Sequence, residues 1–249
     1  MLRNVSASIG PLMHRYGIRP YFSACYASPF LQRNISCDPL NPAAIQWWKA
    51  KTDEIYKLMP NFGGFVVKAD SEGNQGPIHF NRTEAQGANL LARALKPHGG
   101  LVLWRAFVYG LSEGDRAKQA WDIFMPLDGK FDENVIVQIK NGPMDFKVRE
   151  PLSPLFGTLK HTKVVMEVQA AQEYTGHQIH AMSLLPQWKS YLDFDTQGAG
   201  VGTTVGRLLS GRTSIQNVST GMCAVSNVGC VLPLHPCPIA SFNSNSLVA

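Results

Sequence analysis

The feature that most constrains the fold of this chain is an alternation of short apolar runs with segments of helical periodicity. The runs GGFVVKAD and NVIVQIK are almost continuously apolar, which is typical of strands buried on both faces. Residues 42–59 and 83–95 instead carry apolar side chains at helical spacing. Thr83 and Gln86 add a capping-box pattern at the start of the second helix. Alternating strands and helices predict parallel βαβ units.

Counting the apolar runs gives six strands, near residues 20–27, 64–69, 101–108, 134–140, 163–169 and 222–228. A closed (β/α)8 barrel needs eight strands. The chain is therefore expected to form an α/β fold, an incomplete TIM barrel of about six parallel strands, with two strands missing at its front. Further helices are expected over the ranges 112–124, 187–192 and 205–209.

Two segments lack periodicity. Residues 142–162 are interpreted as a long ordered loop, and long loops inside compact domains are often functional. Residues 230–249 contain three prolines and scattered serine and asparagine. We expect a partial-barrel catalytic domain over residues 1–229 and an irregular, disordered tail over residues 230–249.

Composition excludes several classes of protein. The hydrophobic content of 45% over 249 residues is that of a globular protein. The net charge of +5 comes without blocks of Lys or Arg, which favours a solvated basic surface over nucleic-acid binding. No stretch is long and apolar enough for a bilayer span. The histidines and the five cysteines lack metal-ligand spacing, so we assign no metal and no cofactor.

Charged residues cluster where the predicted strands end. Acids and bases gathered at the carboxyl ends of barrel strands are what an enzyme needs to cleave an acidic sugar. A charge within an apolar strand is also costly unless it is paired. The acids are Glu72, Asp145 and Glu173, and the bases are Lys68, Arg105 and Lys140.

Each candidate also has a simpler interpretation. Glu72 fits a solvent-exposed loop carboxylate, and Asp145 fits a turn residue capped by its own backbone. Glu167 lies on the same strand that precedes Glu173 and competes with it, or serves as a buried partner for a base. The three bases are candidates for a cradle around a substrate carboxylate or for internal salt bridges. Trp104 is a candidate for stacking on a sugar or for core packing.

Several segments together resemble one family over residues 2–229. They are GGFVVKADSEGNQGP, RTEAQGANLLARALKPHGG, WRAFVY, PLDGKFDENVIVQIKNGPMDF, REPLSPLFG, QEYTG and WKSYLDFDT. Read in this order, they are similar to the central catalytic domain of the microbial alpha-glucuronidases, glycoside hydrolase family 67. The resemblance implies a (β/α)8 barrel that releases (4-O-methyl-)glucuronic acid from xylan-derived oligosaccharides with inversion. It also implies an extracellular protein, although the N-terminus lacks the apolar region of a secretory signal.

The resemblance assigns roles to the charged residues. Glu72 matches the general acid, and Asp145 and Glu173 match the pair that positions and deprotonates the attacking water. Glu167 then becomes a structural carboxylate. The three bases named above match residues that hold the carboxylate of the sugar.

The chain departs from the family at both ends. Family members carry an N-terminal β-sandwich, two earlier barrel strands and a helical C-terminal domain, none of which is present in the sequence. We therefore expect a truncated form of the catalytic domain. Two alternatives to an active enzyme stay open: an inactive fragment and a protein that only binds acidic oligosaccharides. A barrel hydrolase with another acidic sugar as substrate is a third interpretation.

Overall fold

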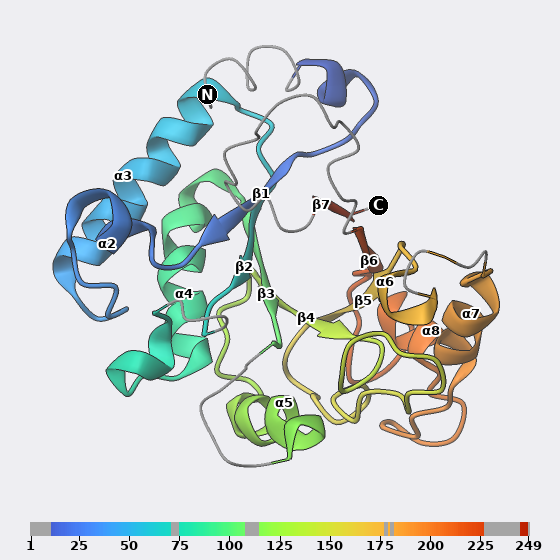
Figure 1. Cartoon of the computed structure of the whole chain (residues 1–249). Coiled ribbons are helices and arrows are strands. Elements are labelled where there is room, and N and C mark those ends of the chain that lie inside the picture. The colour runs from blue at the N-terminus through green and yellow to red at the C-terminus, as the bar shows by residue number, and fades with distance from the viewer. Residues whose placement is uncertain are drawn as a thin grey trace.

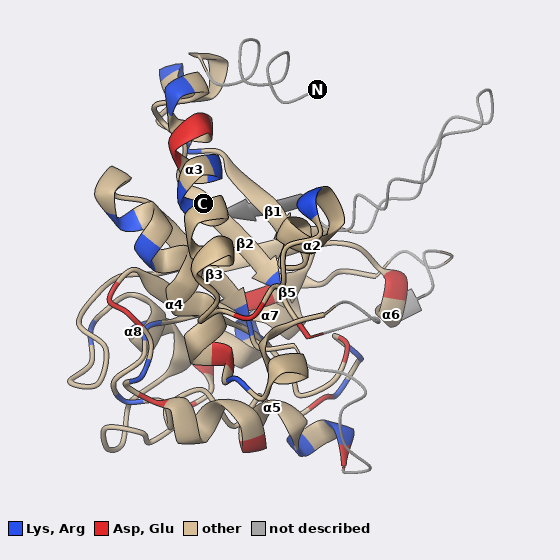
Figure 2. Ribbon diagram, turned by 90° about the vertical axis from the view of Figure 1, so that its left-hand side faces the viewer, with Lys and Arg blue, Asp and Glu red and all other residues tan. Residues whose placement is uncertain are grey.

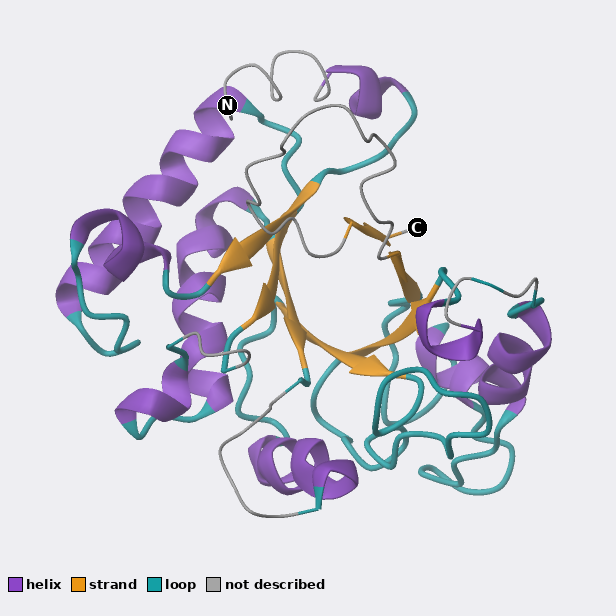
Figure 3. Cartoon of the chain, viewed as in Figure 1, coloured by secondary structure: helices purple, strands orange, loops and turns teal. Residues whose placement is uncertain are grey.

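Six parallel strands follow one another in chain order and form a curled sheet (Figures 1 and 3). The computed structural model describes residues 11–70, 75–107, 115–176, 179, 182–226 and 245–248. Each strand pairs in parallel with the next. The strands are β1 (Tyr21–Cys25), β2 (Gly64–Lys68), β3 (Leu101–Arg105), β4 (Val135–Lys140), β5 (Val164–Gln169) and β6 (Met222–Ser226). The six predicted strands and the incomplete barrel are thus confirmed.

The helices lie outside the curl of the sheet, as Figure 3 shows. The connections from β1 to β2, β2 to β3, β3 to β4 and β5 to β6 carry helical segments, as crossovers between parallel strands usually do. The connection from β4 to β5, residues 141–163, contains no helix, which confirms the predicted long loop. The helices are α2 (Ser28–Arg33), α3 (Pro42–Leu58), α4 (Glu84–Leu95), α5 (Arg116–Phe124), α6 (Glu173–Gly176), α7 (Leu185–Asp193) and α8 (Val205–Leu209). Short 3-10 helices cover η1 (Pro77–Phe80), η2 (Lys96–His98) and η3 (Met125–Leu127). Helices α2 and α6 were not predicted.

Helix α4 has the cap that the sequence predicts at its start. Oγ1 of Thr83 accepts from the amide of Gln86 at 3.2 Å, and the Gln86 side chain accepts from the amide of Thr83 at 2.9 Å, which completes the capping box of α4. In α3, Trp48 is buried, but Ile45 and Leu58 are exposed. The apolar spacing of α3 therefore predicts the helix correctly and its buried face only in part.

Two apolar layers hold the sheet. The larger cluster lies between the strands and the outer helices and includes the fully buried Trp104 and Leu91. A smaller cluster lies on the opposite face and joins Val66, Leu103 and Val165 from β2, β3 and β5. Because side chains alternate between the two faces of a strand, this small cluster identifies the inner face of the curled sheet.

The backbones of β2 and β3 approach so closely at residue 64 that this position requires glycine. Gly64 begins β2 with φ of +139°, and a Cβ there would lie 1.8 Å from the carbonyl oxygen of Leu101 on β3. Only glycine fits this start of the β2–β3 pairing.

The sheet has a seventh strand that the sequence did not predict. Residues 245–248 form β7 (Asn245–Val248), which pairs antiparallel with β6 and contacts β1. For these four residues the structure corrects the expectation of an irregular tail, while residues 227–244 lie outside the described ranges. Pairing with β6 satisfies backbone groups that an open strand edge leaves exposed. None of the helices in the described ranges is both long and apolar enough for a bilayer span.

Candidate active site

Strand alternation places the candidate bases and one acid on the inner face. Lys68 and Arg105 each follow a residue of the inner cluster by two positions, since Val66 precedes the first and Leu103 the second. Glu167 follows Val165 in the same way on β5. These side chains therefore point into the curl at the carboxyl ends of the strands, and Figure 2 shows acidic and basic residues close together beside β5.

Three cations from three adjacent strands surround one aromatic ring. The Nζ atoms of Lys68 and Lys140 lie 4.2 Å and 3.6 Å from the ring centroid of Phe107, and the guanidinium of Arg105 lies 5.1 Å from it. Cations are attracted to the negative face of such a ring. The structure thus brings together the three predicted bases, on a residue that the sequence analysis missed.

Glu167 is the buried partner of Arg105. Its oxygens accept from Nε of Arg105 at 2.8 Å and from Nη2 at 2.6 Å, in a two-pronged pair, and one of them also accepts from Gln138 at 2.6 Å. The side chain of Glu167 is 1% exposed. Burial acts to raise the pKa of Glu167, but Arg105, Gln138 and Lys140 together outweigh it, so the pKa is lowered and the carboxylate is ionised. Of the two alternatives left open by the sequence, Glu167 is therefore the buried partner of a base.

Asp145 pairs with Lys140. Nζ of Lys140 donates to Oδ1 of Asp145 at 2.7 Å and to the carbonyl of Met144 at 2.9 Å. Burial lowers the pKa of Lys140 to about 8, although the hydrogen bond with Asp145 acts to raise it. Asp145 is more open, with 26% of its side chain exposed. The carboxylate is therefore fixed by Lys140 and still partly exposed.

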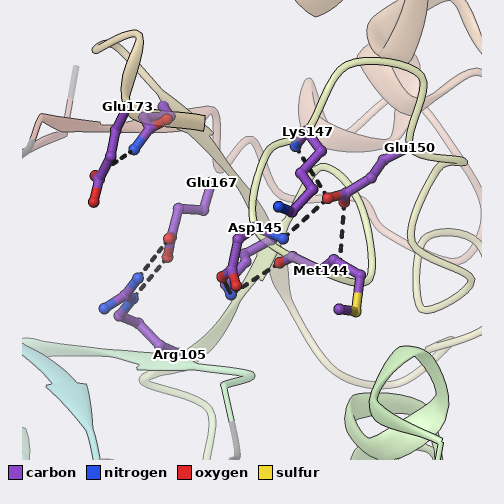
Figure 4. Close-up of polar contacts among 9 residues, drawn as sticks. Arg105, Met144, Asp145, Lys147, Glu150, Glu167 and Glu173 are labelled. Atoms are coloured by element: carbon purple, nitrogen blue, oxygen red, sulfur yellow. Dashed lines mark hydrogen bonds and ion pairs between the residues drawn. The ribbon is translucent and has the colours of Figure 1, made fainter. Parts of the chain in front are cut away.

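Glu173 begins α6, just beyond β5, and its Oε2 accepts from Nε2 of Gln169 at 3.0 Å. In the view of Figure 4, the pair formed by Arg105 and Glu167 lies between Glu173 and Asp145. Glu72 lies outside the described residues, in the gap between Asp70 and Gln75.

Trp104 belongs to the core. It lies on the outer face, is 0% exposed and packs edge-on against Tyr26 at a centroid distance of 5.8 Å. Stacking on a sugar is thereby excluded for this side chain. In the described part of the chain, no three His, Cys, Asp or Glu side chains are grouped as metal ligands.

Three residues of this site were not predicted from the sequence: Phe107, Gln138 and Glu150. Gln138 could have been found, because it precedes Lys140 by two positions and must share its face. Phe107 continues an apolar run in the sequence, so no sequence signal identifies it as part of a site. Glu150, whose carboxylate binds the loop that carries Asp145, gives no signal either.

Comparison with known proteins assigns this chain to a family. The sequence profile of the glycosyl hydrolase family 67 middle domain matches residues 1–231. The "Probable alpha-glucuronidase A" proteins of Aspergillus clavatus and Neosartorya fischeri are each 48% identical over 230 residues, and the "Alpha-glucuronidase A" of Emericella nidulans is 47% identical over 232 residues. Each alignment covers 90% of this chain and 27% of the relative, so the chain spans about a quarter of the length of these proteins. The chain belongs to glycosyl hydrolase family 67 and corresponds to its middle domain.

Proposed function

We propose that this chain acts as an alpha-glucuronidase that releases (4-O-methyl-)glucuronic acid from xylan-derived oligosaccharides with inversion at the anomeric carbon. The observation that carries the proposal is the convergence of Lys68, Arg105 and Lys140 around Phe107. Three cations at one end of a sheet form a site for an anion, and the anion of this substrate is the carboxylate of its terminal sugar. The names of the relatives support the same substrate class.

In this proposal, the cations bind the uronate. Arg105 is held by Glu167, so its guanidinium keeps a fixed orientation beside Phe107. Lys68 and Lys140 supply further positive charge from the neighbouring strands β2 and β4. A neutral sugar gains nothing from this arrangement, so the cations provide specificity for the acid.

The acids carry the chemistry. Glu72 is proposed to protonate the leaving glycosidic oxygen. Asp145 and Glu173 are proposed to hold and deprotonate the water that attacks from the opposite face. In an inverting enzyme the acid and the base stand roughly 6.5–9.5 Å apart, which leaves room for that water. The ion pair of Asp145 with Lys140 supports an ionised Asp145, which is the form that a base requires.

A second candidate function is binding without cleavage. The cation cluster is built entirely from β2, β3, β4 and the residues directly after them, and it needs no further chain to attract an acidic oligosaccharide. Binding of glucuronic acid without release of product would favour this function.

The test is an assay of the chain on aldouronic oligosaccharides. The full-length alpha-glucuronidase A of Emericella nidulans serves as positive control, and Glu72→Gln as the variant that removes the proposed acid. We expect release of glucuronic acid by the chain, with loss of about 100-fold or more in the variant, because general acid catalysis contributes about 10²–10⁴-fold. No release by a folded chain that still binds glucuronic acid would reject cleavage and leave binding.

Proton NMR of the first product tests the stereochemistry. Inversion of an α-glycoside gives the β-anomer first, before mutarotation mixes the two forms. We further propose that the catalytic unit is residues 1–229 and that the protein acts outside the cell, where xylan fragments occur. Secretion can be measured in the culture medium of the producing cells.

A further inference from the structure

The loop after β4 folds around a single carboxylate. Oε1 of Glu150 accepts from the amides of Asp145 and Lys147, each at 3.0 Å, and Oε2 accepts from the amide of Met144 at 3.1 Å (Figure 4). Three backbone N–H groups from one short segment thus converge on one side chain. One of the three belongs to Asp145 itself.

The backbone that Glu150 binds is unfavourable without support. Phe146 has φ of +58° and Arg149 has φ of +65°, both in the left-handed region that residues with a Cβ rarely adopt. Both residues lie inside the segment that the Glu150 carboxylate closes. Hydrogen bonds to a charged acceptor are about twice as strong as neutral ones, so they can hold such a conformation.

The Glu150 side chain is itself confined. Gly142 lies against it, since a Cβ at this position would be 2.0 Å from Oε2 of Glu150. The carbonyl of Glu150 accepts from the hydroxyl of Tyr191 on α7 at 2.8 Å. Glu150 therefore binds the loop amides through its carboxylate and contacts α7 through its backbone carbonyl.

We propose that Glu150 is a positioning residue that fixes the backbone at Asp145 and so aims the Asp145 carboxylate beside Lys140. The inference rests on the proposed function only for the role of Asp145 in catalysis. Its structural part is independent of that function: when the carboxylate of Glu150 is absent, the segment 142–149 loses its order and Asp145 loses its fixed distance from Lys140.

The variant that tests the proposal is Glu150→Gln, which keeps the shape of the side chain. It replaces one acceptor oxygen by an NH2 group, which would then face a backbone N–H donor. Glu133→Gln is the matched control, because Glu133 is an exposed carboxylate paired with Lys96 on the outer surface. Glu150→Asp, which keeps the charge on a shorter side chain, tests for partial rescue.

The first measurement is amide hydrogen exchange of peptides that cover residues 141–151, followed by mass spectrometry. We expect the amides of Met144, Asp145 and Lys147 to exchange at least about tenfold faster in Glu150→Gln, with the other peptides unchanged. Equal exchange in this peptide in both proteins would overturn the proposal. Faster exchange throughout the chain, with a lower Tm, would also overturn it, because it would show a general structural role.

The second measurement is steady-state release of glucuronic acid. We expect kcat to fall about 10- to 100-fold in Glu150→Gln with KM within about twofold, because a displacement of the reacting group costs about this much. The alkaline limb of the pH profile should also move to lower pH, since Asp145 no longer supports the charged form of Lys140. Glu133→Gln should match the wild type in all three quantities.

The outcomes separate the two proposals. Activity of the wild type together with equal activity of Glu150→Gln rejects the positioning role and keeps the proposed function. A wild type that releases no glucuronic acid rejects the proposed function, and the exchange measurement then still decides whether Glu150 orders the segment at Asp145.

Discussion

The indole nitrogen of Trp104 donates a 2.6 Å hydrogen bond to Oε2 of Glu84 on the outer side of the sheet. Both side chains are buried, with Trp104 0% and Glu84 2% exposed. Burial raises the pKa of Glu84 well above its usual range, and the charge of nearby Asp70 raises it further, while the bond from Trp104 acts in the opposite direction. Glu84 therefore keeps its proton at pH values where an ordinary glutamate has lost it.

The raised pKa predicts how stability depends on pH. A carboxyl group whose pKa is higher in the folded than in the unfolded state stabilises the protein fully below the unfolded value, which is 4.5 for Glu84. Its contribution is lost as the pH rises through the folded pKa, by up to about 1.4 kcal/mol per pH unit. Glu84→Gln keeps an acceptor for Trp104 without a titrating group, so its unfolding free energy should fall less between about pH 5 and about pH 8.

Urea unfolding of both proteins across this range measures the difference. Glu54→Gln is the control, because Glu54 is an exposed carboxylate paired with Lys51 and should leave the slope unchanged. Identical slopes for the wild type and Glu84→Gln would contradict a protonated Glu84.

Lys140 predicts the pH dependence of ligand binding. Its pKa of about 8 means that the ammonium loses its proton within a range that is easily measured. If the cation holds the uronate, the Kd of glucuronic acid should rise above pH 8, by at most about tenfold per pH unit. Well below pH 8 the affinity should level off, because nearly all of the ammonium is then charged.

Lys140→Arg supplies the control for this prediction. Arginine keeps its charge throughout the accessible range, so the variant should bind glucuronic acid with a flat pH dependence above pH 8. Isothermal titration at several pH values measures both proteins. A rise in Kd that is the same in Lys140→Arg would assign the titration to another group.

The strands and the bases were predictable from the sequence for one physical reason. A buried strand is continuously apolar, so a charge inside it must have a partner or a function. Lys68, Arg105 and Lys140 all stand out in this way, and the alternation of side chains places them on the inner face.

Other parts were not predictable because they depend on contacts between distant residues. Nothing local distinguishes Phe107 as the ring beneath three cations, and nothing marks Glu150 as the acceptor of three backbone N–H groups. Strand β7 exists through pairing with β6, and four residues carry too little pattern to reveal a partner. Helix α6 is equally short.

Phe107 predicts a further change in binding. Phe107→Leu removes the ring that attracts the ammonium groups of Lys68 and Lys140, and each such contact contributes about 0.5–2 kcal/mol. We therefore expect the Kd of glucuronic acid to rise about 2- to 30-fold. Phe107→Tyr keeps the ring and should bind within about twofold of the wild type. Equal weakening in both variants would show that the size of the side chain matters, and not the aromatic face.

The pair of Arg105 and Glu167 predicts a large loss of stability when one partner is removed. Glu167→Leu leaves the guanidinium of Arg105 in a site where its side chain is only 10% exposed. Removal of one partner of a buried ion pair costs about 3–5 kcal/mol, because the remaining buried charge loses the carboxylate that binds it. Urea unfolding should show a lower midpoint with an unchanged slope.

Two further variants test whether the loss of stability comes from breaking this buried ion pair. Asp132→Asn breaks a surface pair with Arg93, whose side chain is 68% exposed, and should change stability little. Arg105→Met combined with Glu167→Leu removes both buried charges and should recover part of the stability lost in Glu167→Leu. The double variant should bind glucuronic acid more weakly than the wild type, because it lacks the cation that Glu167 orients. A double variant as unstable as Glu167→Leu alone would mean that packing around β3 and β5, and not the lost ion pair, causes the loss of stability.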